Sequence, residues 1–474
     1  MKKALAFTLA LLCVGTWAFA AARNQRSSIP TLVWYALNPE DPEDVVENLR
    51  IMSDYTQEKI GIRFETRPYA ADRIQLVASS GEAVDITWIG AFDYERFQKQ
   101  GVFADITDLL SSQTPALWNY VPQMLWNGAK IDGKIYAVPA YKDTSSTLFG
   151  FLDARYARKY NINTNFTRGD YIREMDAAFR AIKAGEGSQF YPMYLAKGGI
   201  EVRYWIGEKF DDLGAGITNL MGVQVDDPNR RVVSILEQPE VREALRIVHR
   251  WYQDGIINPD APQIEQGPRG VPFTFDQAWP SKAVTIALQQ GIEEYIPIQL
   301  TRPLLTTHSI RGSMLAVGAN SRYKTEALKF IELINTDHKF RDMLAYGIEG
   351  KHFNYVSPNV IHRLTDTYLA YEWAQGTFFN LSVPDNQPAN TWDQVRSQNE
   401  TALASVLNGF SMDISPVQNE ISNILAAVQQ YYPDLSIGVT DPDVAIPQLL
   451  AAIRNVGFDR VMAEAQRQID AFSR

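Results

Sequence analysis

Thr31-Leu32-Val33-Trp34-Tyr35 is dense in residues that favour strands, and it predicts the first strand of a sheet. Asp41-Pro42 predicts the N-cap and first-turn proline of a helix that ends at Gly61. Alternation at Ile62, Phe64 and Thr66 predicts a second strand, and Val84-Asp85-Ile86-Thr87-Trp88-Ile89 predicts a third after another helix. This βαβαβ order predicts an α/β fold, with a parallel sheet covered by helices on both faces.

Residues at the ends of these strands are the first candidates for ligand contact, because ligands of such sheets bind at the carboxyl ends of the strands. The candidates at this edge are Trp34, Tyr35, Trp88, Gly90, Phe92 and Asp93.

The first residues have the order of a secretory signal. Met1-Lys2-Lys3 precedes the apolar run from Ala4 to Gly15, and Ala18-Phe19-Ala20 offers a cleavage site, so residues 1–22 are predicted to be removed. The apolar run is shorter than the roughly 20 residues of a membrane-spanning helix. Cys13, the one cysteine, follows Leu12 instead of the small residue of a lipoprotein signal. We therefore expect an exported chain without lipid, disulfide or thiolate metal site.

Length and charge narrow the remaining possibilities. The 474 residues exceed what one hydrophobic core usually supports, which predicts two or three lobes. The net charge of -10 argues against nucleic acid and against anionic membrane surfaces as partners. A helix is predicted from Pro239 to Gly255, and the last 130 residues are predicted to be mainly helical.

Motifs of catalysis are largely missing. The sequence contains no G-x-G-x-x-G, G-x-x-x-x-G-K-[ST], G-x-S-x-G or H-E-x-x-H, and its five histidines lack metal-ligand spacing. Ser321-Arg322-Tyr323-Lys324 matches the S-x-x-K tetrad of serine enzymes, but an N-cap serine before an amphipathic helix explains it more simply. A glycoside hydrolase stays open, because it needs only two carboxylates at a suitable separation.

Aromatic residues, at 11%, are the more informative signal. Sugar rings stack their C–H faces on indole and phenol rings, while their hydroxyls need polar partners. Trp88, Trp205 and Trp279 each have such polar neighbours, among them Asp93, Arg203 and Gln277. For each tryptophan the alternative is a place in the hydrophobic core. The positions of Trp34, Trp88 and Trp279 after strands or in loops favour a site.

Several stretches resemble the family 1 extracellular solute-binding proteins of ABC importers, in their LipO-like branch. Ser80-Gly81-Glu82-Ala83-Val84-Asp85-Ile86, Ile131-Asp132-Gly133-Lys134-Ile135-Tyr136-Ala137-Val138-Pro139 and Tyr346-Gly347-Ile348-Glu349-Gly350-Lys351-His352 are similar to that family's motifs. Gly409-Phe410 and Pro416-Val417-Gln418-Asn419-Glu420-Ile421 resemble its C-terminal elements.

The resemblance implies a two-lobe periplasmic binding protein fold of type II, with multiple crossovers at the hinge and a mainly helical C-terminal region. It places residues 23–140 and 305–346 in an N-terminal lobe, and 141–304 and 347–474 in a C-terminal lobe. Crossings are expected near 138–143, 295–310 and 347–355. It also implies ligand contacts at the strand end, at the first crossing, in the second lobe and at the last crossing, by Trp88, Asp93, Tyr141, Lys142, Asp143, Trp279, Glu349, Lys351 and His352.

The functional expectation is a periplasmic, monomeric binding protein without cofactor or metal. It would capture an oligosaccharide in the cleft between the lobes and deliver it to the membrane permease of an ABC importer, and it would not be an enzyme. Two alternatives stay open: the same scaffold with a peptide or another polar solute, and a secreted glycoside hydrolase.

Overall fold

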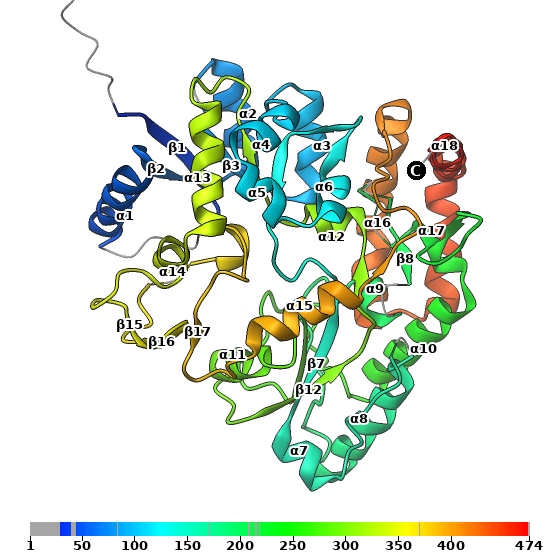
Figure 1. The fold of residues 1–474 in the computed structure, drawn as a ribbon. Coiled ribbons are helices and arrows are strands. Elements are labelled where there is room, and N and C mark those ends of the chain that lie inside the picture. Colours follow the sequence, from blue (N-terminus) through cyan, green and yellow to red (C-terminus); the bar gives the residue numbers. More distant parts are fainter. Residues whose placement is uncertain are drawn as a thin grey trace, which may run out of the picture.

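The structure is a computed structural model, which describes residues 29–38, 44–82, 84–168, 170–206, 209–213, 216–217, 219–368 and 370–472. The predicted signal segment 1–22, Cys13 and the Asp41-Pro42 cap lie outside these residues. Within them, no helix is long and apolar enough to cross a membrane. The chain forms two lobes that are joined by several crossing segments (Figure 1).

The first lobe is built on a five-stranded sheet whose order is β2 (Arg63–Pro68), β1 (Thr31–Ala36), β3 (Ile86–Ile89), β14 (Met314–Val317) and β6 (Ala137–Pro139). β1 pairs in parallel with β2 and β3, which confirms the predicted βαβαβ unit. β14 is antiparallel to both β3 and β6, so the prediction of a wholly parallel sheet is wrong. The reason is that β14 enters the sheet as the chain returns from the second lobe.

Helices cover both faces of this sheet, as predicted. Trp34 and Leu32 of β1 point into one buried cluster with Phe64 and Phe330, whereas Tyr35 points into another on the opposite face. The covering helices are α1 (Val45–Ile60), α2 (Ala71–Ser80), α3 (Ala91–Lys99), α4 (Thr107–Gln113), α5 (Pro115–Tyr120), α6 (Gln123–Ala129), α12 (Thr307–Arg311), α13 (Lys324–Thr336) and α14 (His338–Tyr346). A short hairpin, β4 (Lys130–Ile131) and β5 (Lys134–Ile135), leads to β6.

The second lobe holds an antiparallel sheet in which β7 (Leu148–Asp153) lies between β11 (Phe273–Gln277) and β12 (Tyr295–Gln299). A smaller sheet contains β8 (Phe210–Asp211), β9 (Met221–Gln224) and β10 (Val232–Ser234). The helices of this part of the chain are α7 (Ala154–Lys159), α8 (Ile172–Glu186), α9 (Val202–Trp205), α10 (Pro239–Gln253) and α11 (Lys282–Gln290).

From residue 418 on, the C-terminal region is helical, as predicted, and packs on the second lobe, whereas residues 353–404, which were also predicted to be mainly helical, contain four short strands. α16 (Gln418–Ile437) and α17 (Pro442–Asn455) stand beside α10, and α18 (Phe458–Ala471) packs on α16 and α17, at the right of Figure 1. Leu245 and Val248 of α10 belong to the same buried cluster as Ile424 and Leu449 of α16 and α17. The second lobe and the C-terminal helices therefore share one hydrophobic core.

The crossing segments lie side by side at the waist between the lobes. Residues 140–147 connect β6 to β7, and residues 300–313 return from β12 to β14, close to the first two predicted crossings. Ser146 and Leu304 exchange backbone hydrogen bonds of 2.7 and 2.9 Å. β13 (Leu304–Leu305) also pairs in parallel with β18 (Leu403–Ala404). α15 (Thr391–Thr401) supports this waist, because the Asn399 amide bonds the backbone of Lys142 and Ser145.

Near the predicted third crossing, the chain makes its contacts with the first lobe. Residues 347–355 stay with the first lobe, where the Lys351 ammonium lies 2.8 Å from the Asp44 carboxylate at the start of α1. They lead into a small sheet of β15 (Phe353–Ser357), β16 (Val360–Arg363) and β17 (Val383–Pro384). The chain first reaches the waist near Phe378, whose backbone N–H donates to the Tyr141 backbone oxygen at 3.1 Å, and it pairs there again at β18. The lobe boundaries given above remain a prediction.

The prediction of Ser321 as a helix N-cap is also wrong in detail. α13 starts at Lys324, and the Ser321 hydroxyl accepts a hydrogen bond of 3.0 Å from the backbone N–H of Tyr323 before the helix begins. The same hydroxyl donates to the Asp85 carboxylate at 2.5 Å. Ser321 thus ties the start of α13 to the strand region of the sheet.

Candidate functional site

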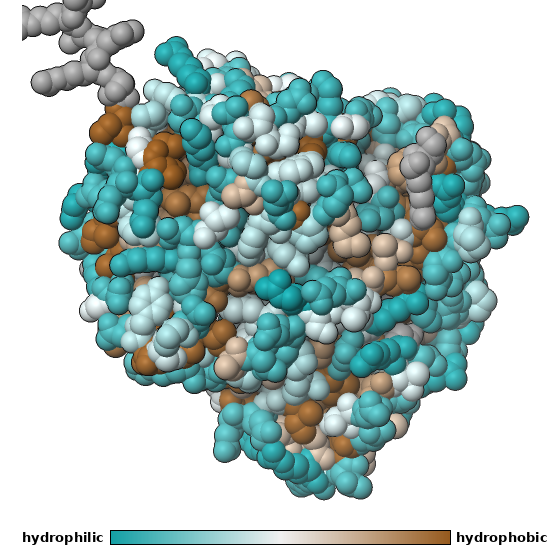
Figure 2. All heavy atoms as spheres, in the orientation of Figure 1, coloured by the Kyte–Doolittle hydropathy of each residue, from teal (hydrophilic) through white to brown (hydrophobic). Residues whose placement is uncertain are grey.

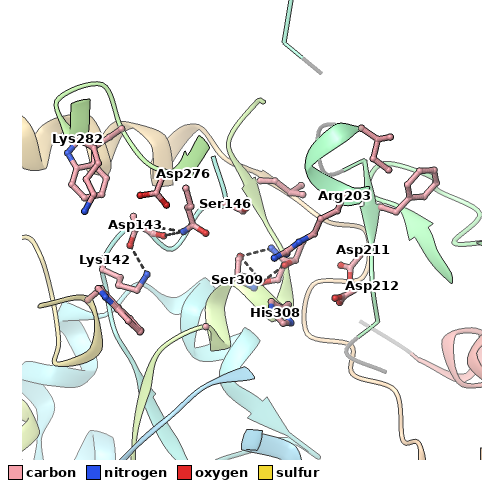
Figure 3. A pocket seen from close by; sticks show the side chains of 18 of the residues that line it. Lys142, Asp143, Ser146, Arg203, Asp211, Asp212, Asp276, Lys282, His308 and Ser309 are labelled. Carbon is pink, nitrogen blue, oxygen red and sulfur yellow. Dashed lines mark hydrogen bonds and ion pairs between the residues drawn. The ribbon is translucent and has the colours of Figure 1, made fainter. Parts of the chain in front are cut away.

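A cavity of about 380 Å³ lies at the waist between the lobes. Its lining comes from the two crossings at 142–146 and 304–312, from the second lobe, and from residues 372–378. In Figure 3, Lys142, Asp143, Asp276 and Lys282 lie on one side of the cavity, while Arg203, Asp211, Asp212 and His308 lie on the other. Parts of the chain far apart in sequence therefore meet here.

At the first crossing, a nearly buried ion pair places two charged side chains at the cavity. The Lys142 ammonium lies 2.6 Å from the Asp143 carboxylate. The Gln277 amide, at the end of β11, donates to the Asp143 backbone oxygen at 2.9 Å and to its carboxylate at 3.3 Å. Desolvation by the surrounding chain raises the pKa of the neighbouring Asp276, although the residue is exposed, while the positive charge of Lys282 works against that rise. This wall offers donors and acceptors in fixed positions.

Asp211 is the most perturbed group of the opposite wall. It ends β8 and is only 5% exposed. Burial, followed by repulsion from the adjacent Asp212 carboxylate, raises the pKa of Asp211 to about 6. The backbone N–H of Leu213 donates to its carboxylate at 3.2 Å, which opposes that rise. A poorly solvated carboxylate that faces a cavity gains from a hydroxyl donor on a bound molecule.

Aromatic rings complete the lining: Phe210, Trp279, Trp373 and Phe378. Trp279 is 4% exposed and packs edge-to-face on Phe378, with 5.8 Å between ring centroids, and on Trp392 at 5.9 Å. Trp373 is partly exposed and presents a more accessible ring. The cavity therefore combines flat apolar faces with carboxylate, amide and ammonium groups.

Arg341 of α14 fixes the segment that carries Glu372, Trp373 and Phe378. Its guanidinium is fully buried and donates to the backbone oxygens of Glu372 at 2.6 Å and Thr377 at 2.8 Å. It also donates to the Gln375 side-chain oxygen at 3.0 Å. Burial lowers the pKa of Arg341 to about 10, so the group stays charged at neutral pH. Three bonds from one rigid fork hold this part of the wall in place.

The structure brings four of the predicted residues into the lining: Lys142, Asp143, Gln277 and Trp279. Two more lie one side chain behind it. The Trp88 ring stands edge-on to Trp373 at 6.0 Å, and its indole N–H donates to the Ser313 hydroxyl at 3.0 Å. Tyr141 packs on Phe379 at 4.4 Å.

Three predicted contacts are wrong, because their side chains belong to the core. β1 continues to Ala36, so Trp34 and Tyr35 lie inside the strand, and their side chains are 1% and 0% exposed on its two covered faces. Trp205 is 1% exposed and packs on Trp251 and Phe275. The turn of α9 places Arg203 and Ile206, three residues apart, on the side of the cavity instead.

The remaining four predicted residues make contacts away from the cavity. Asp93 pairs with Arg96 on α3. Within residues 347–355, the Glu349 carboxylate lies 3.7 Å from the Lys339 ammonium. The Lys351 ammonium pairs with Glu47 of α1 and with Asp44, the residue before α1. The buried His352 ring accepts a hydrogen bond of 2.9 Å from the backbone N–H of Ile348. These three residues follow α14 and do not line the waist cavity, so a ligand role for them remains a prediction.

Sequence reasoning missed much of the second wall. Phe210, Asp211 and Asp212 follow one another at the end of a two-residue strand that no alternation pattern reveals. Trp373 has the signal used for the other tryptophans, since Glu372 is its neighbour. Arg203 is named only as a polar neighbour of Trp205, and Lys282 and His308 carry no local signal.

One side-chain cluster superficially resembles a serine hydrolase triad. The Ser382 hydroxyl lies 3.0 Å from His338 Nε2, but it donates to the Asp342 carboxylate at 2.7 Å, and His338 Nδ1 faces the backbone oxygen of Asn380. In a triad the carboxylate holds the far nitrogen of the histidine instead. Ser382 is also fully buried. The tetrad serine, Ser321, is no better placed, since Lys324 donates to its backbone oxygen.

Comparison with known proteins gives two family matches. The model described as "Bacterial extracellular solute-binding protein" matches residues 50–349, and a "Domain of unknown function (DUF3502)" matches residues 406–474. A "Carbohydrate ABC transporter substrate-binding protein" of Streptococcus pneumoniae is 23% identical over 464 residues, covering 94% of this chain and 91% of that protein.

Solved structures extend the likeness to the fold. The N-glycan transport solute binding protein NgtS of Streptococcus pneumoniae matches with a TM-score of 0.82 and 20% identity, over 93% of this chain and 98% of that one. The same protein in complex with Man1GlcNAc gives 0.77, with 20% identity over 93% and 99% of the two chains. Its complex with Man5GlcNAc gives 0.74, with 21% identity over 94% and 98%.

Proposed function

Because the chain belongs to the bacterial extracellular solute-binding protein family, we propose that its waist cavity captures an oligosaccharide for delivery to the permease of an ABC importer. The observation that carries the proposal is the lining of that cavity, where aromatic rings and hydrogen-bonding side chains alternate.

The chemistry of this lining suits a sugar better than a peptide. Trp373 and Phe210, which are partly exposed, offer faces for sugar C–H groups, while the buried Trp279 and Phe378 border the cavity behind them. Asp276, Asp211 and Gln277 offer oxygens that accept hydrogen bonds from hydroxyls, and the buried carboxylate of Asp211 gains most from them. The related proteins named above also carry carbohydrate or glycan in their names, which supports the same ligand class.

The charged side chains of the lining favour a neutral oligosaccharide over an acidic one. Five carboxylates line the cavity, namely Asp143, Asp211, Asp212, Asp276 and Glu372, against three basic side chains, Lys142, Arg203 and Lys282. The excess of negative groups repels an acidic sugar, while a neutral one brings no charge to be desolvated.

Delivery requires that the permease distinguish the loaded protein from the empty one. The lining combines second-lobe residues such as Asp211 with Trp373, whose segment is held by α14 of the first lobe, so a ligand that binds both favours the approach of the lobes. Only a difference in affinity between the open and closed forms can couple capture to transport. The protein would work as a periplasmic monomer and return its ligand without breaking a bond.

The test is a thermal-shift screen of the purified protein, with residues 1–22 removed, against neutral and acidic oligosaccharides. Calorimetry then measures each hit, and chromatography compares the sugar before and after incubation. We expect a rise in Tm, a neutral sugar as the best ligand, and recovery of the intact sugar. Shorter products would support the glycoside hydrolase alternative, and a response to peptides alone would replace the sugar by a peptide.

Trp279→Ala is a poor variant for this test, because the ring is almost fully buried. Removing a buried tryptophan costs about 3–5 kcal/mol of folding stability and confuses binding with unfolding. Trp373 is the better position, and Trp118 is its control. Trp118 is also partly buried, but it stacks on Trp126 at 5.1 Å in the first lobe, away from the cavity.

A further inference from the structure

A second cavity, of about 300 Å³, adjoins the waist cavity. It lies between α3 of the first lobe and residues 410–418, which lead into α16 on the second lobe. Asp211 and His308 belong to the linings of both cavities, so these two side chains form the boundary between them. A molecule that fills the waist cavity and continues past His308 enters this second space.

Phe92 gives the second cavity an aromatic face that packing does not explain. Its side chain is 66% exposed, although large apolar side chains are usually covered. Its ring stands edge-to-face with His308, with 4.7 Å between ring centroids, so both rings lie at the boundary. Phe410, 6% exposed, adds a second ring on the opposite side of the lining.

The polar groups of the second cavity alternate with these rings. Glu95, on α3, accepts a hydrogen bond from the Ser411 hydroxyl across the cavity and lies 3.6 Å from the buried Arg311 guanidinium. The Gln100 and Gln418 amides also belong to the lining. Each amide carries both donors and an acceptor, which matches the needs of a sugar hydroxyl.

The walls of the second cavity come from different lobes and are already tied together. The Lys99 ammonium, at the end of α3, lies 2.7 Å from the Asp413 carboxylate and 3.1 Å from Glu95. The two walls therefore approach or separate with the same hinge motion that opens the waist cavity.

We propose that the second cavity binds an extension of the same oligosaccharide, with Phe92 stacking on a sugar ring beyond His308. The inference rests on the proposed function and deepens it, because it assigns a minimum ligand size. Each cavity is near the lower end of the roughly 300–1,000 Å³ typical of small-molecule sites. Occupation of both needs a ligand longer than a disaccharide.

The test compares the binding of Man1GlcNAc with that of Man5GlcNAc. For every neutral glycan that raises Tm in the screen, it also compares a disaccharide of that glycan with a pentasaccharide. Calorimetry measures both sizes on the wild type, on Phe92→Ala, and on Leu288→Ala as a control. Leu288 is 65% exposed on α11, in the second lobe. We expect the longer sugar to bind more tightly, and Phe92→Ala to weaken only the longer sugar, by about tenfold.

A second variant, Phe92→Trp, places a fluorescent indole at the boundary. Its emission is expected to change with the pentasaccharide and to stay constant with the disaccharide. If Phe92→Ala binds both sizes as the wild type does, the inference is overturned while capture in the waist cavity stands. If no oligosaccharide binds the wild type, the proposed function is wrong, and this inference is wrong as well.

Discussion

Replacing Asp211 by Asn should make the unliganded protein more stable at neutral pH. Asp211 is buried, and its pKa is raised to about 6 by desolvation and by the charge of Asp212. In the unfolded chain its pKa returns to about 3.9. The folded state therefore holds the proton more tightly, and its stability is largest below the unfolded value and falls as the pH rises through 6.

The size of the effect on the free energy of unfolding follows from the difference between the folded and unfolded pKa values of Asp211. A difference of about two pKa units corresponds to about 3 kcal/mol in total, since one unit is about 1.4 kcal/mol. About half of it lies between pH 5 and pH 8, because the unfolded carboxyl is already mostly ionised at pH 5. Asn has the same shape and no charge, and its side-chain oxygen can still accept the hydrogen bond from the Leu213 N–H.

Calorimetric unfolding of wild type and Asp211→Asn from pH 5 to pH 8 measures this directly. The variant should gain stability over the wild type with rising pH, and the difference should shrink towards pH 5. Asp413→Asn is a control of opposite sign. Lys99 and the Ser415 hydrogen bonds lower the pKa of Asp413 to about 2, so its charged form stabilises the fold above the unfolded pKa. An Asp211→Asn protein that melts at or below the wild type at pH 8 would refute the reasoning.

Three further outcomes are expected. Trp373→Ala should weaken binding of the best neutral sugar about tenfold, whereas Trp118→Ala should leave Kd unchanged in the same calorimetric titration; equal losses would remove Trp373 from the site. Arg341→Met should lower the free energy of unfolding by about 3 kcal/mol, because it leaves buried acceptors at Glu372, Gln375 and Thr377 without a donor. A denaturant titration that shows no loss of stability would contradict this. Lys99→Met should widen the separation of the lobes in the ligand-free protein, which small-angle scattering measures as a larger radius of gyration. It should also make the effect of salt on Tm smaller, which melting at low and high ionic strength measures. If neither the radius of gyration nor the salt response changes, the Lys99–Asp413 pair does not hold the lobes together.

The sequence by itself determined the local elements and the family. Residues 31–36 form a strand because they are dense in residues that favour strands, and residues 45–60 form a helix because their apolar side chains recur with the helical period. The motifs around residues 80–86 and 131–139 pointed to the solute-binding family before any contact was known. Lys142, Asp143, Gln277 and Trp279 were also found, since each stands at the end of a strand or at a crossing, where position follows from the order of elements.

Only the tertiary structure decided which side chains face the ligand. Trp34 lies inside β1 and Trp373 in a short 3-10 helix, and the first is sealed by Phe330 while the second borders the cavity. Asp211 and His308 stand almost 100 residues apart and become neighbours in the lining only when β8 and α12 meet at the waist. Exposure and pKa are properties of surroundings, and here the surroundings come from segments that are distant in the chain. Local periodicity therefore reveals the elements, while the packing of the two lobes sets the site.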